Sequence, residues 1–317
     1  MMRSSLSIIG SRLLQLIVMI LLLSFITFVL MKLTPGDPIG AVLQVDDVVS
    51  TKEDKQKVME EYGFDQPILK QYGNWLLDLA QLDLGNSIIS KKPVIEIIVE
   101  KLPATFLLAA GGLTALLIIA VPLGVLGAIY EGRWPDYLSR VIAMLGASIP
   151  SFWLGLLFIY FFSLKWNLLP VMGKGSLAHF ILPSLTLGIA MAPMYIKLLR
   201  ERLISTLQSN YIEAAYARGL NKHRVLVFHA LRGSLISIVT MFGLSIGSLL
   251  GGITVIEILF SWPGMGDLIV KAVMQRDYPL IQGYIIVVGV IVVMTNLMVD
   301  FIYNLINPQI KLGKGWG

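Results

Sequence analysis

YIEAAYARGL, at residues 211–220, lies between long apolar runs of the chain. The segment holds three alanines, a glycine, one glutamate and one arginine, and it lacks a cluster of large aliphatic side chains. The residues from Tyr211 to Arg218 favour a helix, and Gly219 suits the position just after a helix end. The sequence therefore predicts a short, slim helix between two apolar segments.

The residues that follow, NKHRVLVFHAL, predict a second helical segment. Val225, Phe228 and Leu231 recur at helical spacing, so we expect them on one face. The segment 197–234, between two apolar runs, is thus expected to contain two short helices that meet at Gly219.

The slim helix is suited to contact with another protein. Ala214, Ala215 and Ala217 form a surface narrow enough for a groove, and Glu213 and Arg218 are placed to fix the register through charge-assisted hydrogen bonds. An ordinary amphipathic surface loop explains the same spacing, and the spacing alone leaves both interpretations open.

Composition places the rest of the chain in a membrane. Of 317 residues, 56% are hydrophobic and only 14% are charged, with a mean hydropathy of +0.77; soluble domains carry about 25% charged residues. The absence of cysteine excludes disulfides, thiolate metal sites and a cysteine nucleophile. A net charge of +5 fits basic residues that hold the chain on the cytoplasmic side, rather than a nucleic-acid-binding surface.

Six apolar stretches are long enough to cross a bilayer, because a hydrocarbon layer of about 30 Å needs about 20 residues. The first exceeds the core of a signal peptide and lacks a small-residue cleavage site, so we expect it to be retained. The sequence predicts an all-α, polytopic membrane protein with six transmembrane helices, at roughly 9–31, 104–130, 138–163, 180–200, 235–260 and 280–306.

The distribution of charge predicts which side each connection faces. With the N-terminus inside, the cytoplasmic pieces are 1–12, 131–140, 197–234 and 307–317, and they hold thirteen lysines and arginines against four acids. The segment 34–100 then lies outside, with twelve acids against six lysines. This bias follows the positive-inside rule and places both termini in the cytoplasm. We expect 34–100 to form a small ordered cap, because its apolar residues recur at helical spacing.

The sequence offers no catalytic constellation. An ATP-binding P-loop needs Ser or Thr after its Gly-Lys pair, but Lys174 and Lys314 are both followed by glycine. The fourteen methionines are scattered singly, which favours packing over soft-metal binding. Hydrogen bonding within loops is the simpler interpretation of the three histidines, which are His179, His223 and His229.

Two acids lie in or near predicted spans. Ionisable groups inside a membrane are costly, and by default they suggest a function. Glu257, with Trp262, is therefore a candidate for the outer mouth of a translocation path, and Asp300 for a deeper position. Both acids fall close to span ends, so pairing or helix capping remains the structural alternative.

EAAYARGL resembles the Glu-Ala-Ala…Gly loop of the permease subunits of bacterial ABC importers. Glu213, Ala214, Ala215, Gly219 and Leu231 match that pattern. The family's Ile and Pro are replaced here by His229 and Arg232, a departure that resembles the dipeptide/oligopeptide/nickel branch. Further motifs resemble the same branch along nearly the whole chain, namely TPGDP (34–38), YGFDQP (62–67), LDLGNS (82–87), LPAT (102–105), IPSFWLG (149–155), FSWPGMGDL (260–268), RDYPLIQGY (276–284) and NPQI (307–310).

The resemblance implies a type I ABC importer fold and a permease subunit that forms half of the pore, without an ATPase site or cofactor of its own. A coupling helix between the fourth and fifth spans would dock on a separate ATPase through Glu213, Ala214, Ala215, Arg218, Gly219 and Leu231. The implied partners are a second related permease, two ATP-binding subunits, an extracytoplasmic solute-binding protein and the lipid of a bacterial cytoplasmic membrane. The expected parts are an N-terminal helix at 1–33, an external cap at 34–100, the transporter domain at 101–306 with its coupling loop at 201–232, and a tail at 307–317.

The substrate is less sharply indicated. KQYGNWLLDLAQLDLGNS and LLPVMGKG resemble the nickel permeases of the branch, which implies nickel or a nickel- or cobalt-type chelate. Short peptides are the alternative. An uncoupled channel or a membrane scaffold belongs to a different class, and the spans lack the polar lining at helical spacing that a channel needs.

Overall fold

The computed structural model of the chain describes residues 14, 15, 17–29, 56 and 65–306, without the side chains at 235–237, 239, 240, 243–250, 300 and 303–306. Among these residues the structure contains helices and turns, with an isolated bridge between Asn86 and Pro93 and no strand. The all-α prediction is confirmed, whereas the first half of the predicted cap and the C-terminal tail lie outside the described residues.

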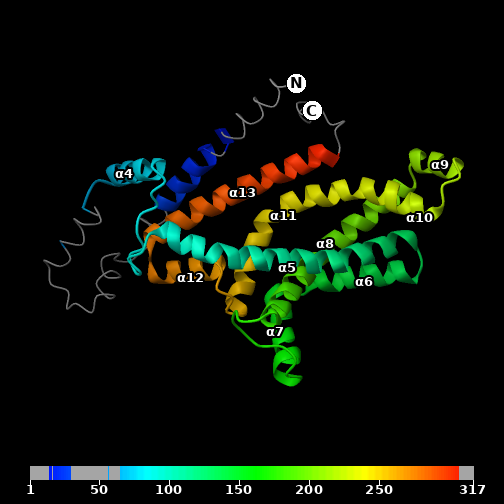
Figure 1. The fold of residues 1–317 in the computed structure, drawn as a ribbon, viewed down its shortest axis with the longest axis horizontal. Helices are drawn as coiled ribbons and strands as arrows, with labels where there is room; N and C mark the ends of the chain where they lie inside the picture. The colour runs from blue at the N-terminus through cyan, green and yellow to red at the C-terminus, as the bar shows by residue number, and fades with distance from the viewer. Residues whose placement is uncertain (1–13, 16, 30–55, 57–64, 307–317) are drawn as a thin grey trace. The chain divides into compact units, whose positions relative to one another are not determined.

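The helices follow one another in the order drawn in Figure 1. A short apolar helix at Ile17–Val29 precedes them. The helices that follow it are α4 (Ile68–Ala80), α5 (Val94–Ile129), α6 (Trp134–Ser148), α7 (Ser151–Phe158), the π-helical η1 (Ile159–Lys165), α8 (Leu177–Leu207), α9 (Asn210–Ala217), α10 (Lys222–Val225), the π-helical η2 (Leu226–Leu231), α11 (Arg232–Leu259), α12 (Met265–Gln275) and α13 (Tyr278–Ile306).

Three of the described helices, α5, α8 and the Tyr278–Val299 part of α13, are each long and apolar enough to cross a membrane. The predicted span at 138–163 is not one straight helix. It is broken between α6 and α7, which together with η1 form a pair bent by 100°. Pro150 causes the break, because it disfavours helical backbone at the preceding residue, and Ile149 is extended with φ −95° and ψ 121°.

The chain divides into two compact units, of which the first comprises residues 1–103 and 267–294. Its central contact is the buried carboxylate of Asp277, which accepts hydrogen bonds from the Ser87 hydroxyl and from the Ile88 N–H at 3.1 Å. The Leu280 N–H lies 3.4 Å from the same carboxylate, so Asp277 also caps the start of α13. The LDLGNS and RDYPLIQGY motifs therefore meet at one buried acid.

The second unit comprises residues 104–266 and 295–317. Its described core lies where α5, α7, α8 and α11 pack together around Leu108, Leu182, Leu187, Ile253, Ile256 and Phe260. Small residues allow this packing, since a Cβ at Gly188 would collide with Ala115 and with the backbone of α5. Within this unit, α8 leads at one end into α9 and α10 (Figure 1).

Candidate functional site

The corner after α9 has the geometry that the sequence predicts. Gly219 adopts a left-handed backbone with φ +81°. Its N–H bonds to the carbonyl of Tyr216 at 2.9 Å, and the Leu220 N–H bonds to the carbonyl of Ala215 at 3.3 Å. These two bonds form a Schellman motif, which satisfies carbonyls that the helix end would otherwise leave free. The predicted helix ending at Gly219 is confirmed.

One face of α9 packs inward. Ile212 and Ala215 are buried against Leu203 of α8, Val225 of α10 and Ala230 of η2. Ala215 was expected on the docking surface, and this expectation is wrong, because it lies three residues after Ile212 on the same inner face. Its small side chain allows α9 to lie close to the helices beneath it.

The other face of α9 is open to solvent. The side chains of Glu213, Ala214, Ala217 and Arg218 are exposed, and Gly219 follows them in the exposed corner. A Cβ at Gly219 would meet no atom within 4 Å. The structure thus places four of the expected contact residues, Glu213, Ala214, Arg218 and Gly219, along one continuous exposed strip.

The second helical segment differs from its prediction. Val225 is fully buried, but Phe228 is 65% exposed and Leu231 is half-buried. The cause is the π-helical turn η2, in which hydrogen bonds connect residues five apart instead of four. The inward positions are consequently Val225 and Ala230, five residues apart, and the expected shared face of Val225, Phe228 and Leu231 is wrong.

The exposed Phe228 was missed by the sequence reasoning. It lies beside a hollow of about 370 Å³ that is lined by Arg224, Val227, Phe228, His229 and Arg232. Two arginines give this hollow a positive character. In an α-helix, residue 228 shares a face with Val225 three positions earlier, so the helical spacing predicted a buried ring.

Glu257 lies in a buried cluster at the end of α11. Its side chain is fully buried, and it accepts hydrogen bonds of 2.6 Å from the Thr105 hydroxyl and from the Gly266 N–H. The Thr105 oxygen in turn accepts from the Met265 N–H at 2.7 Å. Hydrogen bonds of this kind offset the cost of burying a carboxylate. The LPAT and FSWPGMGDL motifs therefore meet at this acid.

Trp262 belongs to the same cluster. It is 1% exposed, and its indole N–H donates to the carbonyl of Ala104 at 2.8 Å. Gly264 leaves the space that the Glu257 carboxylate occupies, since a Cβ there would collide with it. Within this chain both candidate path residues are enclosed by packing. The third candidate, Asp300, lies in α13, and its side chain is outside the described residues.

An ion pair between α6 and α8 was also missed. Asp136 is 1% exposed and receives both Nε and Nη2 of Arg200, at 2.5 and 2.9 Å. The Gly132 N–H adds a bond of 3.0 Å, and the Arg140 Nε lies 3.4 Å from the same carboxylate. The two partners are 64 positions apart in sequence, so charge patterning along one helix gives no indication of the pair.

Comparisons with known proteins agree with this architecture. Residues 120–312 match the sequence model of the binding-protein-dependent transport system inner membrane component, and residues 5–109 match the N-terminal model of such membrane components. The MetNI methionine ABC transporter, solved in inward-facing conformations, resembles the chain with a TM-score of 0.56 at 16% identity, over 67% of this chain and 96% of that one. This likeness establishes the type I importer fold.

Curated relatives extend over almost the full length. The glutathione transport system permease protein GsiC of Pectobacterium atrosepticum is 37% identical, over 95% of this chain and 97% of its own. The nickel import system permease protein NikB of Staphylococcus aureus is 36% identical, over 96% and 92%. Together with the matching motifs and the membrane-spanning helices, these likenesses show that the chain belongs to the binding-protein-dependent transport system inner membrane component family and is a permease subunit of an ABC importer.

Proposed function

We propose that the chain forms half of a translocation pathway and is driven by a separate ATPase that holds α9. The observation that supports this most directly is the two-sided character of α9. Its outer strip is exposed, whereas its inner face is packed on residues of α8, α10 and η2. Because α9 packs on α8 and on η2, and η2 continues directly into α11, a displacement of α9 is passed to both α8 and α11.

The assembly that fits this role contains a second related permease, two ATP-binding subunits and an extracytoplasmic binding protein. In it, ATP is bound by the partner subunits, and α9 and both chain termini face the ATPase side of the bacterial cytoplasmic membrane. The positive hollow at Phe228 lies just beyond α9 in the chain and extends the proposed contact. It favours a partner surface that offers a carboxylate, because Arg224 and Arg232 line it.

A bulky residue on the outer strip tests the proposal. Ala214→Trp fills the strip without altering the backbone at Gly219, so the isolated chain should fold normally. We expect co-purification of the ATPase subunits and substrate-stimulated ATP hydrolysis to fall by about tenfold or more, as for the loss of a central interface contact. Leu168→Trp, at an exposed position between η1 and α8 and outside the expected coupling loop, is the matched control. Equal ATPase binding by both variants would refute the coupling role.

For the cargo, we propose nickel in the form of a chelate, or a similar nickel- or cobalt-type complex. Support comes from the segments that resemble nickel permeases and from the relative named as a nickel import permease. Among the described residues, no three His, Asp or Glu side chains gather in a group that could hold a metal ion. The proposal therefore takes the ligands from the chelator, with this chain supplying a transient polar path.

Glutathione or another short peptide is the second candidate, because the relative named for glutathione transport is as similar as the nickel relative. Uptake in a strain that lacks the permease gene separates them. Restored uptake of radioactive nickel, competed by chelator-bound nickel but not by glutathione, supports the first. Restored uptake of glutathione that chelator-bound nickel does not compete supports the second. Uptake by the purified chain alone in liposomes would instead support an uncoupled channel.

A further inference from the structure

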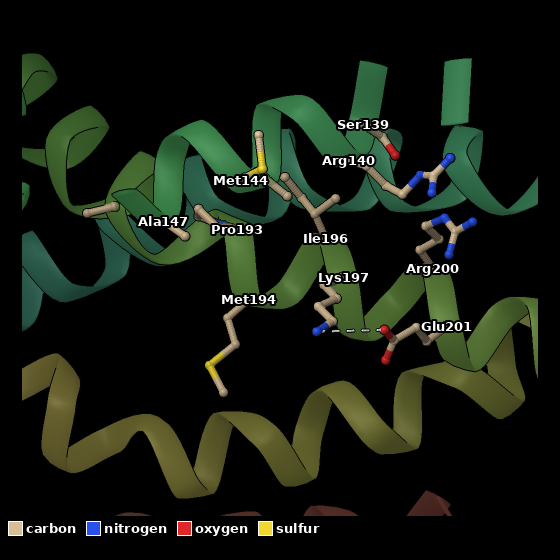
Figure 2. Close-up of a pocket in the computed structure, with 12 residues that line it drawn as sticks. Ser139, Arg140, Met144, Ala147, Pro193, Met194, Ile196, Lys197, Arg200 and Glu201 are labelled. Atoms are coloured by element: carbon tan, nitrogen blue, oxygen red, sulfur yellow. Dashed lines mark ion pairs between the residues drawn. The ribbon is translucent and has the colours of Figure 1, made fainter. Parts of the chain in front are cut away.

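A groove of about 610 Å³ runs between α6 and α8. Figure 2 shows that its two ends differ in character. Arg140, Lys197 and Glu201 gather at the end nearer α9, whereas Met144, Ala147 and Met194 line the part farther along. The groove therefore has a charged mouth and an apolar floor.

The charged mouth has one more basic side chain than the carboxylates that these side chains contact. Arg200 is held by the buried Asp136, so its charge is balanced within the protein. Arg140, with a side chain 49% exposed, lies 3.4 Å from the same carboxylate, so Asp136 balances only one of the two arginine charges. Lys197, with a side chain 74% exposed, faces the exposed carboxylate of Glu201. The Lys197 and Glu201 charges lie 4.0 Å apart, a solvent-exposed pair that is weakly held. The mouth is thus suited to an anion.

Aromatic residues indicate the depth of the mouth. Trp134 and Tyr137, at the start of α6, are 74% and 57% exposed. Exposed tryptophan and tyrosine on a membrane helix are typical of the boundary between hydrocarbon and water. The Arg140 guanidinium lies 4.6 Å from the ring centroid of Tyr137, at the same level. From there, the groove leads along α6 and α8 toward the apolar residues Met144, Ala147 and Met194.

We propose that this groove binds one anionic phospholipid from the leaflet on the α9 side. Its phosphate lies between Arg140 and Lys197, and one acyl chain lies along the floor formed by Met144, Ala147 and Met194. An arginine and a lysine at the membrane boundary suit a phosphodiester, and a basic pocket between membrane helices is a recurrent form of such sites. The proposal depends on the chain being a membrane protein and is independent of the proposed coupling through α9.

Lipid retention by the assembled importer tests the proposal. The complex is reconstituted in a mixture of phosphatidylglycerol and phosphatidylcholine and purified in detergent, and the retained lipids are quantified by mass spectrometry. We expect the unaltered complex to retain phosphatidylglycerol in preference. Arg140→Gln with Lys197→Gln should reduce that retention by about 30-fold. Each basic residue near a membrane surface strengthens the binding of anionic lipid by about fivefold, and the double variant removes two of them.

Arg133→Gln with Arg202→Gln is the matched control, since both residues are exposed and neither lines the groove. It removes the same charge and should leave retention unchanged. Ala147→Phe keeps every charge but fills the floor, and it should also release the lipid. Equal losses in the two double variants, or no preference for phosphatidylglycerol, would overturn the proposal. Cross-linking of a photoreactive phosphatidylglycerol to a neighbouring subunit instead of α6 or α8 would show that a protein covers the groove.

Discussion

Gly219 combines a left-handed backbone with open space around its Cα. Gly219→Ala should destabilise the corner by about 1–2 kcal/mol, because a Cβ disfavours this conformation. Gly219→Asn should cost less, because asparagine tolerates it better. We therefore expect substrate-stimulated ATP hydrolysis of the assembled importer to fall more in Gly219→Ala than in Gly219→Asn. A larger defect in Asn than in Ala would contradict this backbone argument and indicate that the partner excludes any side chain at the corner.

Gly264 is constrained by volume. Gly264→Ala places a methyl group against the buried Glu257 carboxylate, and we expect a loss of about 1–3 kcal/mol or more, as for other overpacked sites. Thermal unfolding in detergent measures it. Gly251→Ala is the control, because Gly251 lies in α11 with no atom within 4 Å of an added Cβ. Similar unfolding temperatures for the two variants would show that the Glu257 cluster adapts more easily than its packing implies.

At the scale of the element, η2 determines which residues face inward. Val225→Ala should destabilise the chain by about 2 kcal/mol, since it removes buried methyl groups. Phe228→Ala should change stability by less than about 0.5 kcal/mol, because the ring is exposed. Thermal unfolding of the detergent-solubilised chain compares them. A large loss for Phe228→Ala would mean that the segment follows the α-helical pattern and that the ring is buried.

The Asp136–Arg200 pair holds α6 to α8. Asp136→Ala leaves a largely buried guanidinium without its partner, and a loss of about 3–5 kcal/mol in unfolding free energy is expected. The double replacement Asp136→Leu with Arg200→Leu should recover much of that loss, because apolar residues of similar volume can replace a buried ion pair. If the double variant is no more stable than Asp136→Ala, the unpaired guanidinium is not the main cause of the loss. The ion pair itself then stabilises the fold.

The elements also show where sequence reasoning succeeded. The end of α9 at Gly219 was predictable because one local rule, glycine in a left-handed corner, determines it. The bend at Pro150 was not predicted, because hydropathy over a long window measures composition and is insensitive to the direction of the chain. The π-helical turn was not predicted, because its residues suit an α-helical turn equally well. The Asp136–Arg200 pair was not predicted, because its two residues are distant in sequence.

At the scale of the whole molecule, four of the motifs that resemble the family contribute to tight internal clusters. LDLGNS and RDYPLIQGY surround Asp277, and LPAT and FSWPGMGDL surround Glu257. Such clusters leave little freedom for substitution, since every buried polar atom needs its partner. The glutathione permease and the nickel permease are 37% and 36% identical to this chain, so overall likeness does not distinguish the two substrates.

The bent pair of α6 and α7 decides how many times the chain crosses the membrane. If the pair, with η1, is one crossing, then three crossings separate Ser90 from Ala214, and these residues lie on opposite sides. If it is a re-entrant loop, only α5 and α8 cross between them, and both lie on one side. The bias of basic residues predicts three crossings, with Ala214 inside.

Single cysteines resolve this directly, because the chain has none of its own. Ser90→Cys, Lys174→Cys and Ala214→Cys all lie at exposed positions, and a membrane-impermeant maleimide is applied to intact cells and then to permeabilised cells. We expect positions 90 and 174 to react in intact cells and position 214 only after permeabilisation. Because α8 alone separates 174 from 214, that pair checks the method. Reaction of 90 and 174 from opposite sides would mean that the Pro150 bend turns the chain back within the membrane, and the six-span topology would then be wrong.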